Sequence, residues 1–120
     1  MILLCPGARL WFSCDQMAKA MQQMGQDYID IESVCFKASF NNEMAKHPDP
    51  FTEAKGYNGP VMLMRADDDD QVDEETCFRY AQGYQNAKFH KVSNGGHDFA
   101  SIEARDKVEE TISSFIKEHI

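Results

Sequence analysis

An unbroken apolar run that ends in a cluster of acids constrains the fold of this chain more than any other feature. Residues 61 to 64 read Val-Met-Leu-Met, Gly59 and Pro60 precede them, and the consecutive aspartates Asp67 to Asp70 follow closely. Such a run between turn residues predicts a strand that is covered on both faces, as in a parallel sheet. Open α/β sheets bind ligands at the carboxyl ends of their strands, so these acids are the first candidates for chemistry.

A glycine-flanked histidine follows the next predicted strand. Residues 87 to 92 favour a strand, and Gly95 and Gly96 directly precede His97. A carboxylate after one strand and a histidine after the next form the Asp-His half of a catalytic triad, in which the acid fixes the tautomer of the base. The glycines permit the backbone angles that point a loop histidine back over a sheet. From the residues alone, an alternative stays open: His97 only binds a backbone carbonyl group.

Residues 59 to 118 resemble the carboxy-terminal segment of the α/β-hydrolases, and most of all the small carboxylesterases of the cinnamoyl/feruloyl esterase type. The family pattern is a Gly-Pro-Val strand, His-Gly-Asp-x-Asp-x-x-Val-Pro, a helix, a strand, Gly-x-x-His and a last helix. The resemblance implies that the second acid is Asp69, that the histidine is His97, and that the ancestral chemistry is carboxylic-ester hydrolysis. It leaves open whether Asp67 rather than Asp69 partners His97. Residues 1 to 7 look like the sixth strand of the family, which follows the nucleophile helix.

The chain departs from the family pattern around the acids and at the nucleophile. Arg65 and Ala66 stand where the family has His-Gly, and Asp73 stands where it has Pro. The family holds its serine in a Gly-x-Ser-x-Gly elbow, and no such motif is present in the chain. The resemblance therefore implies an acid and a histidine without their nucleophile.

Cys5 comes closest to a nucleophile by sequence, because Gly7 follows two residues later. Leu3 replaces the first glycine of the elbow, however, and Pro6 has no backbone N–H to donate to an oxyanion. We therefore interpret Cys5 as a buried strand residue.

Composition excludes several classes of partner. The net charge of −8 argues against nucleic acid and anionic membranes, since both require basic patches. No apolar run approaches the roughly 20 residues of a membrane span, and the first residues lack the basic flank of a signal peptide. The four cysteines show no Cys-x-x-Cys spacing, which favours reduced thiols and a cytoplasmic protein.

The sequence predicts neither a cofactor nor a dedicated metal site. An EF-hand register that starts at Asp67 has Val72 in place of the required glycine and Phe78 in place of the closing glutamate. A solvated turn of acids is the simpler interpretation.

Three helices are predicted from their capping residues. Ser13 or Asp15 is expected to cap a helix that runs to Met24. Asp73 is expected to cap a second helix, over residues 74 to about 82, and Ser101 the last helix. The last helix carries its apolar residues on one face, as a helix that packs on a sheet does.

The length of 120 residues predicts one partial domain, about half the size of a complete α/β-hydrolase. Residues 1–58 would hold the first strand and a lid-like helical region, and residues 59–120 the acid-loop strand, the histidine loop and the C-terminal helix. Within the first part, residues 27 to 40 fit a strand or a helix, and we favour a helix.

The expected fold is a three-layer α/β domain with a small, mostly parallel sheet of about three strands. Its first strand would normally lie in the middle of a sheet, so the edge near Ile2 to Cys5 would expose unpaired backbone groups. We therefore expect a homo-oligomer or a complementary subunit.

Three functions are compatible with these observations. The first is a hydrolase-like domain that lacks its serine and is inactive alone, with Asp69 and His97 retained and a small ester or apolar molecule as a candidate ligand. The second is the Asp-His half of a split serine esterase, completed by another chain, and a non-catalytic interaction module is a variant of the first. In the third, the acids and His97 serve a metal or another ligand, because fold alone does not give function.

Overall fold

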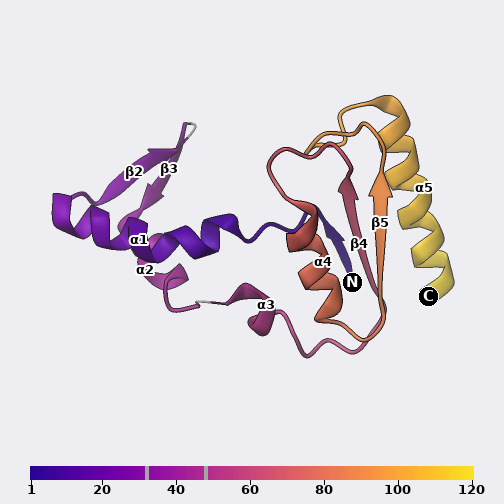
Figure 1. The fold of residues 1–120 in the computed structure, drawn as a ribbon, viewed down its shortest axis with the longest axis horizontal. Coiled ribbons are helices and arrows are strands. Elements are labelled where there is room, and N and C mark those ends of the chain that lie inside the picture. Colours follow the sequence, from indigo (N-terminus) through magenta and orange to yellow (C-terminus); the bar gives the residue numbers. More distant parts are fainter. Residues whose placement is uncertain (32, 48) are drawn as a thin grey trace. The chain divides into compact units, whose positions relative to one another are not determined.

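The computed structural model describes residues 1–31, 33–47 and 49–120. The chain divides into two compact units, residues 1–7 with 54–120 and residues 8–53 (Figure 1). The first unit holds a parallel sheet and the second a small hairpin with helices, so each is described by itself.

The larger unit is built on a parallel sheet of three strands, β1 (Ile2–Leu4), β4 (Val61–Ala66) and β5 (Ala87–Val92). The strand order is β1-β4-β5, so the apolar run occupies the central strand, and all six residues of β4 are buried. Leu63 lies opposite Leu3 on one side and Phe89 on the other. The prediction of a small parallel α/β sheet is confirmed.

Helices cover both faces of this sheet. Helix α4 (Glu74–Gln82) and helix α5 (Ile102–His119) lie on opposite sides of it (Figure 1). Because strand residues alternate between faces, every second residue of β4 joins the core beneath α5. That core contains Met62, Met64, Ala66, Val92, Phe99, Ala104 and Phe115.

Both predicted caps of these helices are present. The Asp73 side chain accepts a hydrogen bond of 2.7 Å from the backbone N–H of Thr76 at the start of α4. The Ser101 hydroxyl accepts one of 3.2 Å from the N–H of Ala104 at the start of α5. Each cap satisfies a backbone donor that the helix leaves unpaired, and it thereby fixes the residue at which the helix begins.

Strand β1 lies at the edge of the sheet. Two backbone hydrogen bonds at its ends connect it to β4. The N–H of Cys5 donates to the carbonyl of Met64, and the N–H of Met62 donates to the carbonyl of Met1, each at 2.9 Å. The intervening residues Ile2 and Leu4 therefore direct their backbone groups away from β4. Among the described residues, no strand pairs with that side.

The smaller unit contains α1 (Arg9–Met24), β2 (Tyr28–Ile31), β3 (Val34–Lys37), α2 (Ala38–Met44) and α3 (Pro50–Glu53). The prediction that Ser13 or Asp15 caps α1 is wrong, because the helix begins at Arg9 and Ala8 provides no side-chain cap. The predicted end at Met24 is confirmed, and Gly25 closes it in the left-handed conformation with φ +63°.

The preference for a helix over residues 27 to 40 is also wrong. The segment forms an antiparallel hairpin in which Ile29 lies opposite Phe36 and Ile31 opposite Val34, and α2 begins at Ala38. In the first strand Ile29 and Ile31 alternate with acids, a period of two that suits a strand. At the turn, the N–H of Ser33 donates to Oδ1 of Asp30 at 3.0 Å.

None of the described helices combines the length and apolar character that a membrane span requires.

Candidate active site

Side chains from three segments meet at the carboxyl ends of the three parallel strands. Cys5 directly follows β1, residues 67–73 follow β4, and residues 93–100 follow β5. We call the last two segments the acid loop and the histidine loop. Since parallel strands end at the same edge of a sheet, the topology alone brings the three segments together.

Asp69 and His97 are in direct contact. Nδ1 of His97 lies 3.0 Å from Oδ2 and 3.1 Å from Oδ1 of Asp69. The Asp69 side chain is fully buried, whereas 28% of the His97 side chain is exposed. Nε2 of His97 makes no hydrogen bond within the described part of the chain. The arrangement is that of an acid holding an imidazole by one nitrogen and leaving the other free.

Asp69 is held in its ionised form. Burial opposes ionisation, but the backbone N–H groups of Val72 and Gln71 each donate to Oδ1 at 2.9 Å. These bonds, with those from His97 and Cys5, outweigh the burial and lower the pKa of Asp69 to about 2. An ionised carboxylate only accepts hydrogen bonds. Nδ1 of His97 therefore carries the proton of this contact.

The two preceding acids bind the backbone of the histidine loop. Oδ1 of Asp67 accepts from the N–H of Asn94, and Oδ1 of Asp68 accepts from the N–H of Gly96, both at 2.9 Å. The Gly96 amide lowers the pKa of Asp68. Three successive carboxylates thus fasten one loop to the other, and the contact with His97 falls to Asp69 rather than Asp67.

Arg65, at a position where the chain departs from the family pattern, donates hydrogen bonds to the backbone of the acid loop. The residue is 6% exposed. Its Nε donates to the carbonyl of Val72 at 2.6 Å, Nη2 to that of Asp69 at 2.8 Å and Nη1 to that of Asp67 at 3.4 Å. From the sequence, Arg65 was only a departure from the His-Gly of the family pattern. In the structure, one guanidinium group satisfies three carbonyl groups of the loop.

Gly95 and Gly96 position His97 for different reasons. A Cβ atom at Gly95 would lie 3.1 Å from Cβ of Ala66 and 3.2 Å from Cβ of Ala104, so the loop packs closer than a side chain allows. Gly96 has open space around it but adopts φ +63°, in the region that favours glycine.

Cys5 is the site residue that sequence analysis misplaced. The prediction of a buried strand residue is wrong, because β1 ends at Leu4 and Cys5 is partly buried with φ +45°. Its Sγ lies 3.4 Å from the carbonyl oxygen of His97, to which it donates, and also within reach of the Asp69 carboxylate. The signal was available: Cys5 ends a strand predicted to be parallel to the one that precedes Asp69.

The Cys5 thiol is protonated in this environment. Burial, the hydrogen bond with Asp69 and the charge of Asp69 together raise its pKa to about 12. Since the thiolate is the nucleophilic form of cysteine, this environment does not activate Cys5. His97 also makes no hydrogen bond with a hydroxyl group in the described residues, so these supply an acid and a base without an activated nucleophile.

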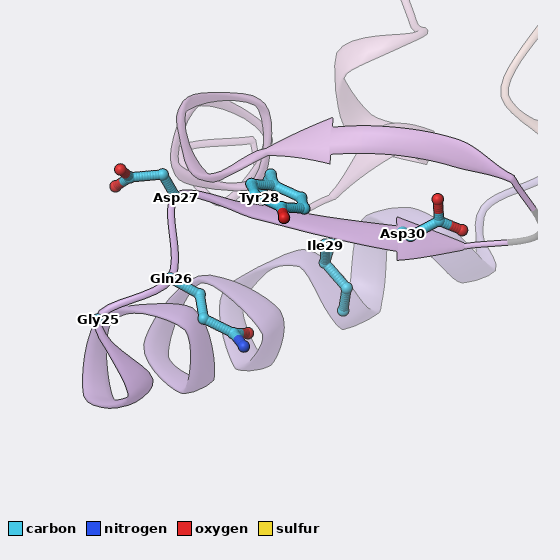
Figure 2. A pocket seen from close by; sticks show the side chains of 6 residues that line it. All are labelled: Gly25, Gln26, Asp27, Tyr28, Ile29 and Asp30. Atoms are coloured by element: carbon cyan, nitrogen blue, oxygen red, sulfur yellow. The ribbon is translucent and has the colours of Figure 1, made fainter.

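A hollow of about 490 Å³ lies in the smaller unit and is separate from this chemistry. It is lined by residues 25 to 30, in the turn from α1 into β2. Figure 2 shows the carboxylates of Asp27 and Asp30 well apart from each other around it. The lining contains no histidine or cysteine. The acid and histidine loops therefore remain the candidate site.

Comparison with known proteins shows the fold. No family model and no curated protein matches the sequence. Solved structures do match over 98% of this chain. Est1E from Butyrivibrio proteoclasticus matches at 19% identity with a TM-score of 0.75, and its ferulic acid-bound form at 19% identity with a TM-score of 0.74. Alpha/beta hydrolase domain-containing protein 10 from mouse matches at 14% identity with a TM-score of 0.74. The chain spans only about half of their length, 48%, 50% and 51% for ferulic acid-bound Est1E, Est1E and the mouse protein. The fold is that of a partial α/β-hydrolase, as the sequence predicted.

Proposed function

We propose that this chain is a hydrolase-like domain that carries the acid and the histidine of a carboxylic-ester hydrolase but not its nucleophile. The contact between buried, ionised Asp69 and Nδ1 of His97 carries the proposal. It is the geometry in which an acid fixes the tautomer of a catalytic base. The fold it shares with Est1E, whose structure was solved with ferulic acid, makes a carboxylic ester the first substrate class to consider.

In this proposal His97 is the general base. Nε2 would take the hydroxyl proton of an incoming serine while the serine oxygen attacks the ester carbonyl carbon. Asp69 would stabilise the imidazolium that forms and would itself stay unprotonated. No such serine contacts His97 in the described residues, and the raised pKa of Cys5 removes the thiol as a substitute. The chain alone is therefore expected to be inactive.

A second candidate is the Asp-His half of a split esterase, and the open edge of β1 favours it. Ile2 and Leu4 direct backbone groups outward from this edge, where no strand of the described residues pairs with them. A further parallel strand on that edge would end beside Cys5, Asp69 and His97. A serine in the turn after such a strand would come from outside the described residues.

Reaction with a fluorophosphonate, followed by intact-mass analysis, tests the missing nucleophile. The same sample is assayed with a short-chain p-nitrophenyl ester, and an active serine hydrolase serves as the positive control for the probe. We expect neither an adduct nor turnover above that of the His97→Ala variant. A stoichiometric adduct together with turnover that His97→Ala abolishes would mean that a serine of this chain is activated.

Sedimentation velocity tests the open edge. We expect self-association of the purified chain or capture of a complementary subunit, weakened by Leu4→Lys, because a charge on an edge strand opposes strand addition. Ile102→Lys, at an exposed apolar residue of α5, is the matched control and should change nothing. A chain that stays monomeric at all concentrations and recovers no subunit would count against strand addition.

A further inference from the structure

The three side chains that meet at the strand ends form a donor set with metal-binding chemistry. Cys5, Asp69 and His97 come from the ends of β1, β4 and β5, and one donor atom from each lies within 4.8 Å of the other two. The sulfur, the carboxylate oxygen and the imidazole nitrogen thus converge from segments far apart in the sequence.

The spacing suits a small tetrahedral ion. Zinc binds sulfur at about 2.3 Å and nitrogen or oxygen at roughly 2.0–2.2 Å, which places its donor atoms about 3.3–3.6 Å from one another. The carboxylate of Asp69 and Nδ1 of His97 are 3.0 Å apart, and no pair of donors is farther apart than 4.8 Å. Shifts of side-chain torsions, without movement of the sheet, would bring all three donors to one ion.

The composition of the set selects a soft divalent cation. Thiolate and imidazole favour Zn²⁺ over Mg²⁺ and Ca²⁺, which take oxygen ligands. The remaining carboxylates nearby are engaged elsewhere, since Asp67 and Asp68 accept from the backbone of the histidine loop. Because 28% of the His97 side chain is exposed, the fourth position of an ion would open to solvent.

We propose that Cys5, Asp69 and His97 bind one thiophilic divalent cation, with Zn²⁺ as the physiological candidate. Binding would release the thiol proton of Cys5 to solvent, and the ring proton of His97 would move from Nδ1 to Nε2 so that Nδ1 can bind the ion. Two of these ligands, Asp69 and His97, are the proposed acid-base pair, but metal binding does not require that they act as one. Bound metal would occupy the carboxylate and the imidazole, so it would silence any base function of His97. The site would then be a point of zinc-dependent inhibition or of structural metal binding.

Titration of the untagged chain with Cd²⁺, followed by its thiolate-to-metal absorption, tests the site without any ester. We expect one ion per chain and a charge-transfer band in the wild type and in Cys35→Ser, the control at an exposed cysteine of β3. Cys5→Ser should abolish the band. Competition with Zn²⁺ should remove it with the same stoichiometry.

His97→Asn provides a second variant should Cys5→Ser fail to fold, because His97 lies on a partly exposed loop. We expect its affinity for Zn²⁺ in calorimetry to fall at least about tenfold, since even the loss of an outer-shell partner costs roughly 10–100-fold. Absence of saturable binding in the wild type, a band lost in Cys35→Ser instead, or unchanged affinity in His97→Asn would overturn the proposal. These outcomes are independent of ester turnover, so failure of the metal site and failure of the proposed function are distinguishable.

Discussion

Nη2 of Arg65 donates a hydrogen bond of 2.8 Å to the backbone carbonyl of Asp69, the residue whose side chain holds His97. The central strand thereby fixes the backbone of the acid, while the amides of Gln71 and Val72 fix its carboxylate. Arg65 is therefore a positioning residue that acts on His97 through the acid loop.

Replacing Arg65 tests this support. Arg65→Met keeps most of the volume but leaves the buried carbonyls of Asp69 and Val72 without their donor, and unsatisfied buried groups cost about 1–3 kcal/mol each. We expect the free energy of unfolding in urea to fall by about 2–4 kcal/mol. Arg79→Met, at an exposed arginine of α4, is the matched control. Equal losses in the two variants would contradict the role given to Arg65.

The two glycines of the histidine loop should respond differently to alanine. Gly95→Ala introduces contacts of 3.1–3.2 Å with Ala66, Ala104 and Phe99, and overpacking of this kind costs typically about 1–3 kcal/mol. Gly96→Ala meets no atom but keeps a left-handed conformation, at roughly 1–2 kcal/mol. A crystal structure should show the acid and histidine loops displaced in Gly95→Ala alone. A displaced loop in Gly96→Ala instead would refute this distinction.

The cap of α4 predicts a pH dependence of stability. The Thr76 amide and side chain lower the pKa of Asp73 from its ordinary value of 3.8. A lowered pKa in the folded state contributes stability that is present above pH 3.8 and is lost as the pH falls through the folded-state pKa. Asp73→Ala should cost about 0.5–2 kcal/mol at neutral pH.

Asp73→Asn separates the charge from the cap, because asparagine keeps an oxygen that accepts from Thr76. Unfolding of the wild type and Asp73→Asn is compared from neutral pH to below pH 3.8. We expect the advantage of the wild type to shrink toward acid. An advantage that is constant across this range would show that the charge plays no part.

The four cysteines should differ sharply in alkylation. Burial and Asp69 raise the pKa of Cys5 to about 12, burial raises that of Cys77 to about 11, and Cys14 is fully buried. Cys35 is exposed and free. Iodoacetamide at neutral pH, followed by peptide mass mapping, should label Cys35 first and Cys5 at least about tenfold more slowly, since the thiolate is the reacting form. Equal rates for Cys5 and Cys35 would contradict the environment described for Cys5.

Local patterns predicted those parts of the fold that depend on neighbouring residues. β4 was predicted from the apolar run, and α4 and α5 from the capping residues Asp73 and Ser101. Capping and burial can be predicted in this way because each depends on residues only a few positions apart in the sequence. The hairpin at residues 28–37 was missed, since its short amphipathic segments fit both periods.

The site was only partly predictable for a related reason. The pairing of Asp69 with His97 follows from parallel strands that end together, and sequence indicated it. The roles of Cys5 and Arg65 depend on contacts between β1, β4 and the loops, which no local pattern records. Cys5 donates to a residue 92 positions away, and Arg65 binds the carbonyls of a loop whose path the sequence does not specify.

The most direct test of the account is the tautomer of His97, read from the ¹⁵N chemical shifts and couplings of its neutral ring in solution. Asp69 is ionised and contacts Nδ1, so we expect the proton on Nδ1 and an unprotonated Nε2, free to act as a base. A neutral ring that carries its proton on Nε2 would show that Asp69 does not orient His97, and the acid-base pair at the centre of the account would be refuted.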